Sequence, residues 1–186
     1  SPYIYDVETI EGLTATPIIG VILKYPHKVQ ENYKNILSLA KPKSIFAESV
    51  RSVRTNLSFM GGQKSTKIIC VTSEISGEGK SFVTVNLAGT LAIIDKKVIV
   101  IAADLRRSKL HKTFNSDNQK GLSTYLAGQH SPEEIIGTDE NHFIDFITSG
   151  PVPPNPSELL HSPMMKALID SLKEKYEYII IDTAPV

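Results

Sequence analysis

Residues 67–81 read KIICVTSEISGEGKS, and this stretch decides the fold of the chain. Its first part, KIICVT at 67–72, is a short apolar run between polar residues, which is typical of a buried strand in a parallel sheet. Apolar residues then recur at helical spacing over 81–94. The loop between strand and helix contains Gly77 and Gly79. Glycines at such a junction let backbone N–H groups converge on an anion, and the positive N-terminal end of the helix adds to the attraction.

The loop itself follows most of the phosphate-binding pattern GxxxxGK followed by Ser or Thr. Lys80 supplies a positive charge for terminal phosphates, and Ser81 supplies a hydroxyl ligand for magnesium. The match is imperfect, because Glu74 stands at the first glycine position. A GKS triplet is common by chance, but its place between a strand and a helix favours a phosphate-binding loop over a structural turn.

Two further apolar runs end in a carboxylate. KVIVIAA at 97–103 precedes Asp104, and YIII at 178–181 precedes Asp182. A second acid at the end of a neighbouring strand holds magnesium in phosphate-loop proteins, and open α/β sheets bind ligands at the carboxyl ends of their strands. We therefore expect both acids at the same sheet edge as Lys80. Taken alone, Asp104 also fits a helix cap.

Arg106 and Arg107 follow Asp104 at this predicted edge. Their guanidinium groups suit a phosphate or a subunit contact, and they equally suit a surface charge.

The alternation of strands and helices predicts an α/β fold, in which right-handed crossovers build a parallel sheet flanked by helices. Besides the three strands above, we expect helices at 131–136 and 163–176 and a strand at 143–148. PVPPNP at 151–156 predicts a rigid extended loop.

The chain divides into an N-terminal approach segment, 1–40, and a phosphate-loop domain, 41–186. The approach segment carries Pro2, Pro17 and Pro26, and its apolar run at 17–23 predicts an edge strand or a packed extended arm.

An amphipathic helix is expected over 43–60. Its apolar residues recur at spacings of four, three, four and three, within about 80° of arc: Phe46, Val50, Val53, Leu57 and Met60. Glu48, Arg51 and Arg54 form a charged stripe that we expect to face away from this apolar stripe. The simplest interpretation of the charged stripe is a set of ion pairs on a solvated face, worth a few tenths of a kcal/mol.

Composition excludes several classes of protein. Lysine plus arginine and aspartate plus glutamate number 20 each among 186 residues, so no net charge draws the chain to nucleic acid. No apolar run approaches the roughly 18 to 20 residues of a membrane span, and residues 1–11 do not resemble a signal peptide. These residues, as given, are expected to be soluble. Cys70 is the one cysteine, and we expect it in the core.

The order of these motifs resembles the cytoplasmic domain of the bacterial tyrosine kinases of capsular and exopolysaccharide export, over nearly the whole chain. TSEISGEGKS resembles the phosphate loop of that family, VIVIAADLRR its second Walker-type motif and YIIIDTAPV its Walker B motif. GPVPPNPSELL at 150–160 is closely similar to a family loop, and the ExxRxxR spacing at 48–54 matches an arginine-rich helix that precedes the kinase core.

This resemblance implies tyrosine autokinase activity with ATP and Mg²⁺ as cofactors. It implies metal ligation by Ser81, Asp104 and Asp182. It implies catalytic roles for Lys80, Asp104 and Asp182, with Asp104 accepting the tyrosine proton. The implied nucleotide-binding residues are Ser76, Gly77, Glu78, Gly79, Lys80, Ser81, Phe82 and Arg106.

The resemblance also implies partners. In the family, subunits form a head-to-tail ring, which here would pair Glu48 of one copy with Arg51 and Arg54 of the next. Further implied partners are a transmembrane polysaccharide co-polymerase portion, fused or separate, and a tyrosine phosphatase. The implied location is the cytoplasmic face of the bacterial inner membrane.

Two departures from the family pattern keep alternatives open. Ala102 stands where the family carries an aspartate, and the chain ends at Val186, before the later strands and the tyrosine-rich tail expected of a complete catalytic domain. A partitioning or cell-division ATPase shares the fold, but it carries a lysine at the position of Ile75. A nucleotide-binding scaffold without catalysis is the third interpretation.

Overall fold

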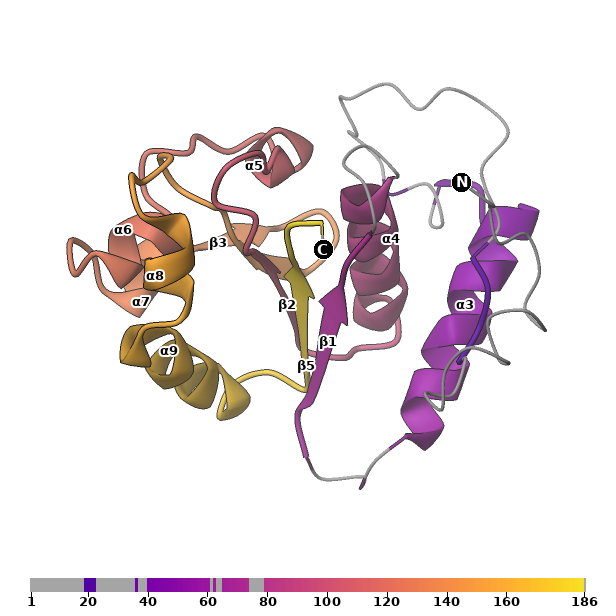
Figure 1. Ribbon diagram of the computed structural model, residues 1–186. Helices are drawn as coiled ribbons and strands as arrows, with labels where there is room; N and C mark the ends of the chain where they lie inside the picture. Colours follow the sequence, from indigo (N-terminus) through magenta and orange to yellow (C-terminus); the bar gives the residue numbers. More distant parts are fainter. Residues whose placement is uncertain are drawn as a thin grey trace, which may run out of the picture.

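The computed structural model describes residues 19–22, 36, 40–60, 62, 65–73 and 79–185. Within these residues the chain forms a mixed, mostly parallel sheet of five strands, in the order β1-β5-β2-β4-β3, with helices on both faces (Figure 1). This confirms the predicted fold class.

The strands are β1 (Lys67–Val71), β2 (Val98–Ala102), β3 (Ile136–Asp139), β4 (Ile144–Ile147) and β5 (Tyr178–Asp182). The helices are α3 (Ile45–Phe59), α4 (Lys80–Ala92), α5 (Leu110–Thr113), α6 (Leu122–Leu126), α7 (Pro132–Ile135), α8 (Pro156–Leu160) and α9 (Pro163–Lys173).

The three strands predicted to carry motifs lie side by side. β5 runs between β1 and β2 and is parallel to both. All residues of β2 and β5 are buried, as their continuous apolar runs predict. At the carboxyl end of β5, Asp182 lies opposite Val71 on one side and Ala102 on the other.

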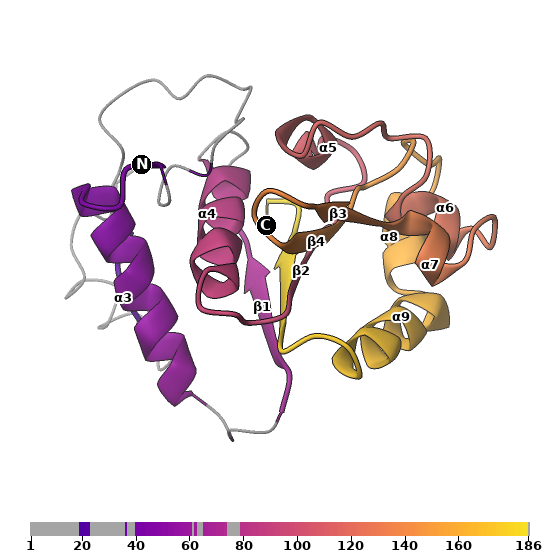
Figure 2. The same cartoon turned by 180° about the vertical axis from the view of Figure 1, so that it is seen from behind.

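Two hydrophobic layers cover the sheet. Val98, Val100 and Ile180 pack into the layer that contains α3 and α4. Ile99 and Ile179 point to the other face and pack into the layer that contains α6 and α9. Figures 1 and 2 show these helices on opposite sides of the strands.

Helix α3 confirms the amphipathic prediction for four of the five apolar positions. Phe46, Val50, Val53 and Leu57 are buried, and the hydroxyl of Ser44 caps the helix by accepting the N–H of Ala47 at 3.1 Å. Met60 is 43% exposed, because it is the C-cap residue in an extended conformation and has left the helical spacing.

β1 is less buried than its sequence predicts. It is an outer strand of the described sheet, and its side chains alternate between partly buried and exposed. Ile69 and Val71 pack toward the layer of α3 and α4, while Ile68 and Cys70 are exposed on the opposite face. The expectation that Cys70 lies in the core is therefore wrong.

The segment after α6 differs from the prediction. The helix expected at 131–136 ends at Ile135, and the chain continues as β3, which pairs antiparallel with β4. The helix expected at 163–176 ends at Lys173. The short helices α5, α6 and α8 were not predicted, because four or five residues are too few for an apolar period to show.

Residues 19–22 form no strand, and the amide of Asn56 on α3 donates to the carbonyl oxygen of Ile19. This part of the approach segment is therefore a packed arm. Most of the remaining positions up to residue 39 lie outside the described residues. No helix among the residues described is both long enough and apolar enough to span a bilayer.

Candidate nucleotide-binding site

The phosphate-loop helix begins where the sequence predicts. α4 starts at Lys80, directly after Gly79, whose φ of 86° is left-handed and favours glycine. The predicted nucleotide-binding residues Ser76, Gly77 and Glu78 lie outside the described residues.

The first turn of α4 is bonded to the end of β5. Lys80 Nζ lies 2.6 Å from Asp182 Oδ1, and Ser81 Oγ donates to Asp182 Oδ2 at 2.6 Å. Asp182 is 1% exposed, and the Lys80 side chain is 11% exposed. A buried carboxylate is costly unless it is paired and hydrogen-bonded, and these two contacts provide both. The structure thus brings together three of the predicted site residues.

Asp104 lies at the same sheet edge, directly after β2. The N–H of Ala103 donates to the carbonyl oxygen of Asp182 at 2.8 Å, which aligns the ends of β2 and β5. Asp104 is 8% exposed, and its Oδ1 accepts the N–H groups of Arg106 at 3.2 Å and Arg107 at 3.1 Å. Asp104 therefore caps a turn and not the helix that its structural alternative predicts, because α5 begins only at Leu110. Its Oδ2 has no hydrogen bond within the described residues.

The other predicted residues at this edge are placed differently. Arg106 is exposed. The ring of Phe82 packs on Phe46 of α3, with centroids 5.0 Å apart. Ala102 is fully buried opposite Asp182, where the family pattern has a carboxylate.

Thr183 helps to position the end of β1, a role that was not predicted from the sequence. Its N–H and its hydroxyl both donate to the carbonyl oxygen of Val71, at 3.1 and 3.0 Å. These bonds hold the end of β1 against β5 immediately before the loop begins. The position of Thr183 after Asp182 is the only sequence signal for this role.

The donor set fits a magnesium nucleotide. Ser81 Oγ and the Asp182 carboxylate are adjacent hard oxygen ligands, which Mg²⁺ prefers. Mg²⁺ in nucleotide sites takes one or two protein ligands together with phosphate oxygens and water, so a larger acidic cluster is not required.

The three residues of the predicted charged stripe of α3 have different environments. Glu48 is exposed, as expected. Arg51 Nη1 donates to the carbonyl oxygen of Pro42 at 2.7 Å, and Arg54 Nη1 donates to the carbonyl oxygen of Thr90 on α4 at 2.9 Å. The expectation that the whole stripe faces away from its own domain is wrong for Arg54, because its long side chain reaches back to the neighbouring helix.

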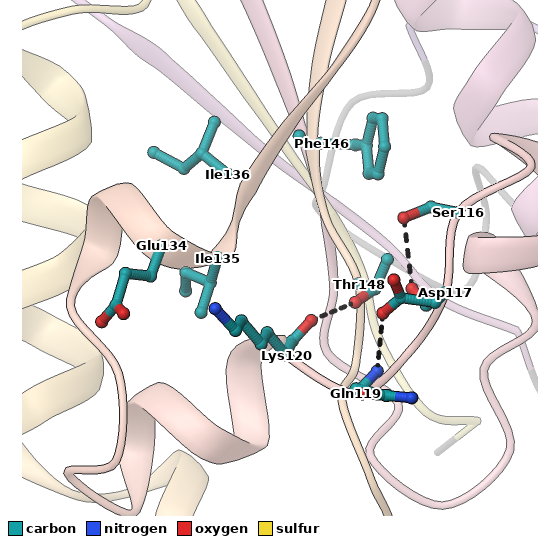
Figure 3. Close-up of a pocket in the computed structure, with 10 residues that line it drawn as sticks. Ser116, Asp117, Gln119, Lys120, Glu134, Ile135, Ile136, Phe146 and Thr148 are labelled. Carbon is teal, nitrogen blue, oxygen red and sulfur yellow. Dashed lines mark hydrogen bonds between the residues drawn. The ribbon is translucent and has the colours of Figure 1, made fainter.

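A separate hollow of about 290 Å³ lies beside β4 (Figure 3). Phe146 and Ile135 contribute apolar side chains to its lining, and Lys120 and Asp117 contribute polar groups. The Thr148 hydroxyl donates to the carbonyl oxygen of Lys120 at 3.0 Å and fixes the loop over the end of β4. None of the predicted nucleotide-binding residues lines this hollow.

Comparisons with known proteins show the family of this chain. The family model described as AAA domain matches residues 66–186. The tyrosine-protein kinase ptk of Acinetobacter johnsonii is 40% identical, and the match covers 98% of this chain and 26% of that protein. The chain therefore spans about a quarter of the length of this relative.

Among solved structures, a tyrosine kinase domain matches this chain with a higher TM-score and coverage than a cell-division ATPase does. The BceF tyrosine kinase domain is 33% identical, with a TM-score of 0.84 over 97% of this chain and 76% of that chain. The septum site-determining protein MinD of Pyrococcus horikoshii, complexed with Mg-ADP, is 28% identical, with a TM-score of 0.54 over 63% of this chain and 48% of that chain. Both the sequence and the fold thus show that this chain belongs to the bacterial tyrosine kinases, within the phosphate-loop AAA-domain family.

Proposed function

We propose that this chain is the ATP- and Mg²⁺-dependent catalytic domain of a protein-tyrosine autokinase that regulates capsule or exopolysaccharide synthesis and export. The observation that carries the proposal is the junction of Lys80 and Ser81 with the buried carboxylate of Asp182. A lysine, a hydroxyl and an acid that meet at a helix start are the groups that phosphoryl transfer requires.

Each group has one task in this proposal. Lys80 leaves the Asp182 carboxylate to contact the terminal phosphates, and Ser81 and Asp182 hold the metal ion. Magnesium, when bound, neutralises charge on the phosphates. Asp104 accepts the proton of a tyrosine hydroxyl. The phenolic oxygen then forms a bond to the γ-phosphorus, the bond to the bridging oxygen breaks, and ADP leaves.

Lys80→Met tests the nucleotide site. We expect it to weaken the binding of magnesium ADP by at least about tenfold, because charged hydrogen bonds contribute about 1.5–3 kcal/mol. Isothermal calorimetry on the full-length protein is the measurement, with Lys112→Met on the exposed side of α5 as the charge-matched control. Equal affinities in the Lys80 variant and its parent would remove the assignment.

Two alternatives differ in what accepts the phosphoryl group. The likeness to MinD favours an ATPase that transfers it to water. The buried Ala102, in place of a carboxylate, favours a scaffold that binds nucleotide without transfer. The kinase would form phosphotyrosine, the ATPase would release phosphate, and the scaffold would do neither. One assay with labelled ATP separates the three.

The proposed partners follow from the family. We assign ring assembly to the face of α3 that exposes Glu48, whose carboxylate is expected to accept hydrogen bonds from Arg51 and Arg54 of the neighbour. A transmembrane co-polymerase portion, a tyrosine phosphatase and a position at the cytoplasmic face of the inner membrane complete the proposal. Nucleic acid is not expected as a partner, because the net charge is zero.

A further inference from the structure

Helix α3 holds α4 near both of its ends. Close to the start of α4, Phe82 stacks on Phe46, with ring centroids 5.0 Å apart and planes at 29°. Close to its end, Arg54 Nη1 donates to the Thr90 carbonyl oxygen at 2.9 Å. The two contacts lie eight residues apart on each helix, at 46 and 54 on α3 and at 82 and 90 on α4. The helices therefore run in the same direction with matched spacing, and both views show them side by side (Figures 1 and 2).

The carbonyl group of Thr90 lacks its usual helical donor. In a continuing helix, the N–H of Ile94 would bond to it, but that N–H donates to Leu91 at 3.2 Å instead. Arg54 supplies the missing donor from another helix. A cation at this position also interacts favourably with the negative C-terminal end of the helix dipole.

The environment of Arg54 shows that this contact is made inside the domain. Its side chain is partly buried, and burial together with the nearby Arg51 charge lowers the pKa of the Arg54 guanidinium. The group remains charged, because arginine does not lose its proton in proteins. Arg51, by contrast, donates to Pro42 beside the start of α3.

We propose that Arg54 is a positioning residue for the nucleotide site, because it fixes the end of the helix whose first turn carries Lys80 and Ser81. The proposal rests on the proposed nucleotide function and gives Arg54 a role within its own subunit, separate from ring contact. Its consequence is that a neighbour that moves α3 moves the phosphate-loop helix with it.

The geometry explains how a contact at Thr90 reaches the site. Thr90 lies nine residues beyond Ser81, which is about 14 Å along a helix that rises 1.5 Å per residue. Core residues such as Val85 and Leu91 seat α4 on the sheet, and the two contacts with α3 fix its tilt there. Without the contact at Thr90, α3 holds α4 only near Phe82, and the tilt of α4 against α3 is less restrained. Displacements of about 1 Å at a reacting group cost up to about 10²-fold in rate, so a small tilt is sufficient to matter.

The test compares Arg54→Ala, Arg54→Lys and Arg51→Ala in the full-length protein, well below the unfolding temperature of each. We expect Arg54→Ala to weaken magnesium ADP binding by about fivefold to tenfold, because the first turn of α4 is then less preorganised for the phosphates. Arg54→Lys keeps a cation and should recover part of this loss. Arg51→Ala, the matched control, should stay within about twofold, because its partner is not on α4.

Hydrogen exchange gives a readout that does not depend on nucleotide. We expect faster exchange of the amides of Val83 and Thr84, in the first turns of α4, in Arg54→Ala but not in Arg51→Ala. If the parent does not bind magnesium ADP, the proposed function fails, and exchange at these two amides still decides the role of Arg54. If Arg54→Ala does not fold, the same comparison is made with Arg54→Lys.

Two results would overturn the proposal. One is a folded Arg54 variant with parental nucleotide affinity and parental exchange at Val83 and Thr84. The other is a variant that loses assembly while its nucleotide affinity and α4 exchange stay unchanged, because Arg54 would then belong to the subunit interface.

Discussion

Asp104 combines two roles that substitutions can separate. Its Oδ1 accepts two backbone N–H groups and shapes the turn after β2, while its negative charge makes it the proposed proton acceptor. Asparagine keeps an acceptor oxygen of similar shape without the charge, and alanine keeps neither. The pair of variants therefore distinguishes a structural from a catalytic acid.

We expect Asp104→Asn to lower phosphotyrosine formation by at least about 10²-fold, because removal of a proton acceptor typically costs about 10² to 10⁴ in rate. Affinity for magnesium ADP should stay within about tenfold, and the free energy of unfolding should change by less than about 0.5 kcal/mol. Asp104→Ala should lose the same activity and also about 1–2 kcal/mol of stability. Radiolabelled ATP and denaturant titration measure the two effects, and parental activity of Asp104→Asn would show that the acid is structural.

At the scale of elements, Tyr176 ties β4 to the entrance of β5. Its hydroxyl donates to Asp145 Oδ2 at 2.5 Å, and Asp145 Oδ1 accepts the Thr138 hydroxyl at 2.8 Å. Burial, followed by the hydrogen bond and the charge of Asp145, raises the pKa of the Tyr176 phenol far above its ordinary value of 10.0. Folding therefore favours the neutral phenol.

This pKa predicts the pH dependence of stability. Because the pKa is raised in the folded state, the stabilisation is complete below about pH 10 and is lost as the pH rises above that value. We expect Tyr176→Phe to be less stable than its parent by about 1–2 kcal/mol at pH 7, and to lose less stability between about pH 9.5 and 11.5. Urea titrations across that range test this, and equal alkaline slopes in variant and parent would contradict it.

The junction of α6 with the loop after β4 depends on Gly121. A Cβ at this position would lie 2.3 Å from the backbone nitrogen of Gly150 and 2.6 Å from the carbonyl oxygen of Thr148. Backbone atoms there cannot yield, because the N–H of Leu122 donates to that carbonyl at 2.8 Å. A side chain at position 121 would therefore collide with backbone atoms that are held in place.

We expect Gly121→Ala to lower the free energy of unfolding by about 3 kcal/mol, as overpacking against fixed atoms does. Gly128→Ala is the control and should cost about 1 kcal/mol, because Gly128 has a φ of 75° but a Cβ added there would meet no atom of the described residues within 4 Å. Thermal unfolding of both variants separates crowding from backbone strain. Similar losses in the two variants would exclude the crowding argument.

The sequence predicted the helices and strands that depend on the pattern of neighbouring residues. The apolar runs of β2 and β5 and the period of α3 and α4 were sufficient, and the acids that follow β2 and β5 predicted the site edge. The antiparallel β3 was not predicted. Its four residues, IGTD at 136–139, show no clear alternation of apolar and polar side chains, and the signals for a helix start directly before them led to the prediction of a helix up to residue 136. The inward reach of Arg54 was not predicted either, because helical spacing gives the direction of a Cβ and not the end of a long side chain.

At the scale of the whole molecule, the structure changes how assembly should be tested. A double change of Arg51 and Arg54 would disturb the contact between α3 and α4 as well as any ring interface. Glu48 is exposed and suits a test that leaves that contact intact.

We therefore expect Glu48→Arg to prevent the proposed assembly and leave the full-length protein monomeric, because like charges would then face one another across the proposed interface. Magnesium ADP affinity per subunit should stay within about twofold. Sedimentation velocity measures the first effect and calorimetry the second. Assembly that survives the charge reversal would place the ring interface elsewhere.

The exposed side chain of Cys70 has a practical consequence. It is the one thiol in the 186 residues, and it lies on β1 next to Val71, whose carbonyl oxygen is held by Thr183. A thiol-reactive fluorophore would thus attach at a single place, a few residues before the phosphate loop, without any engineered cysteine. The chain carries its own attachment point for an optical reporter of what happens when nucleotide enters and leaves.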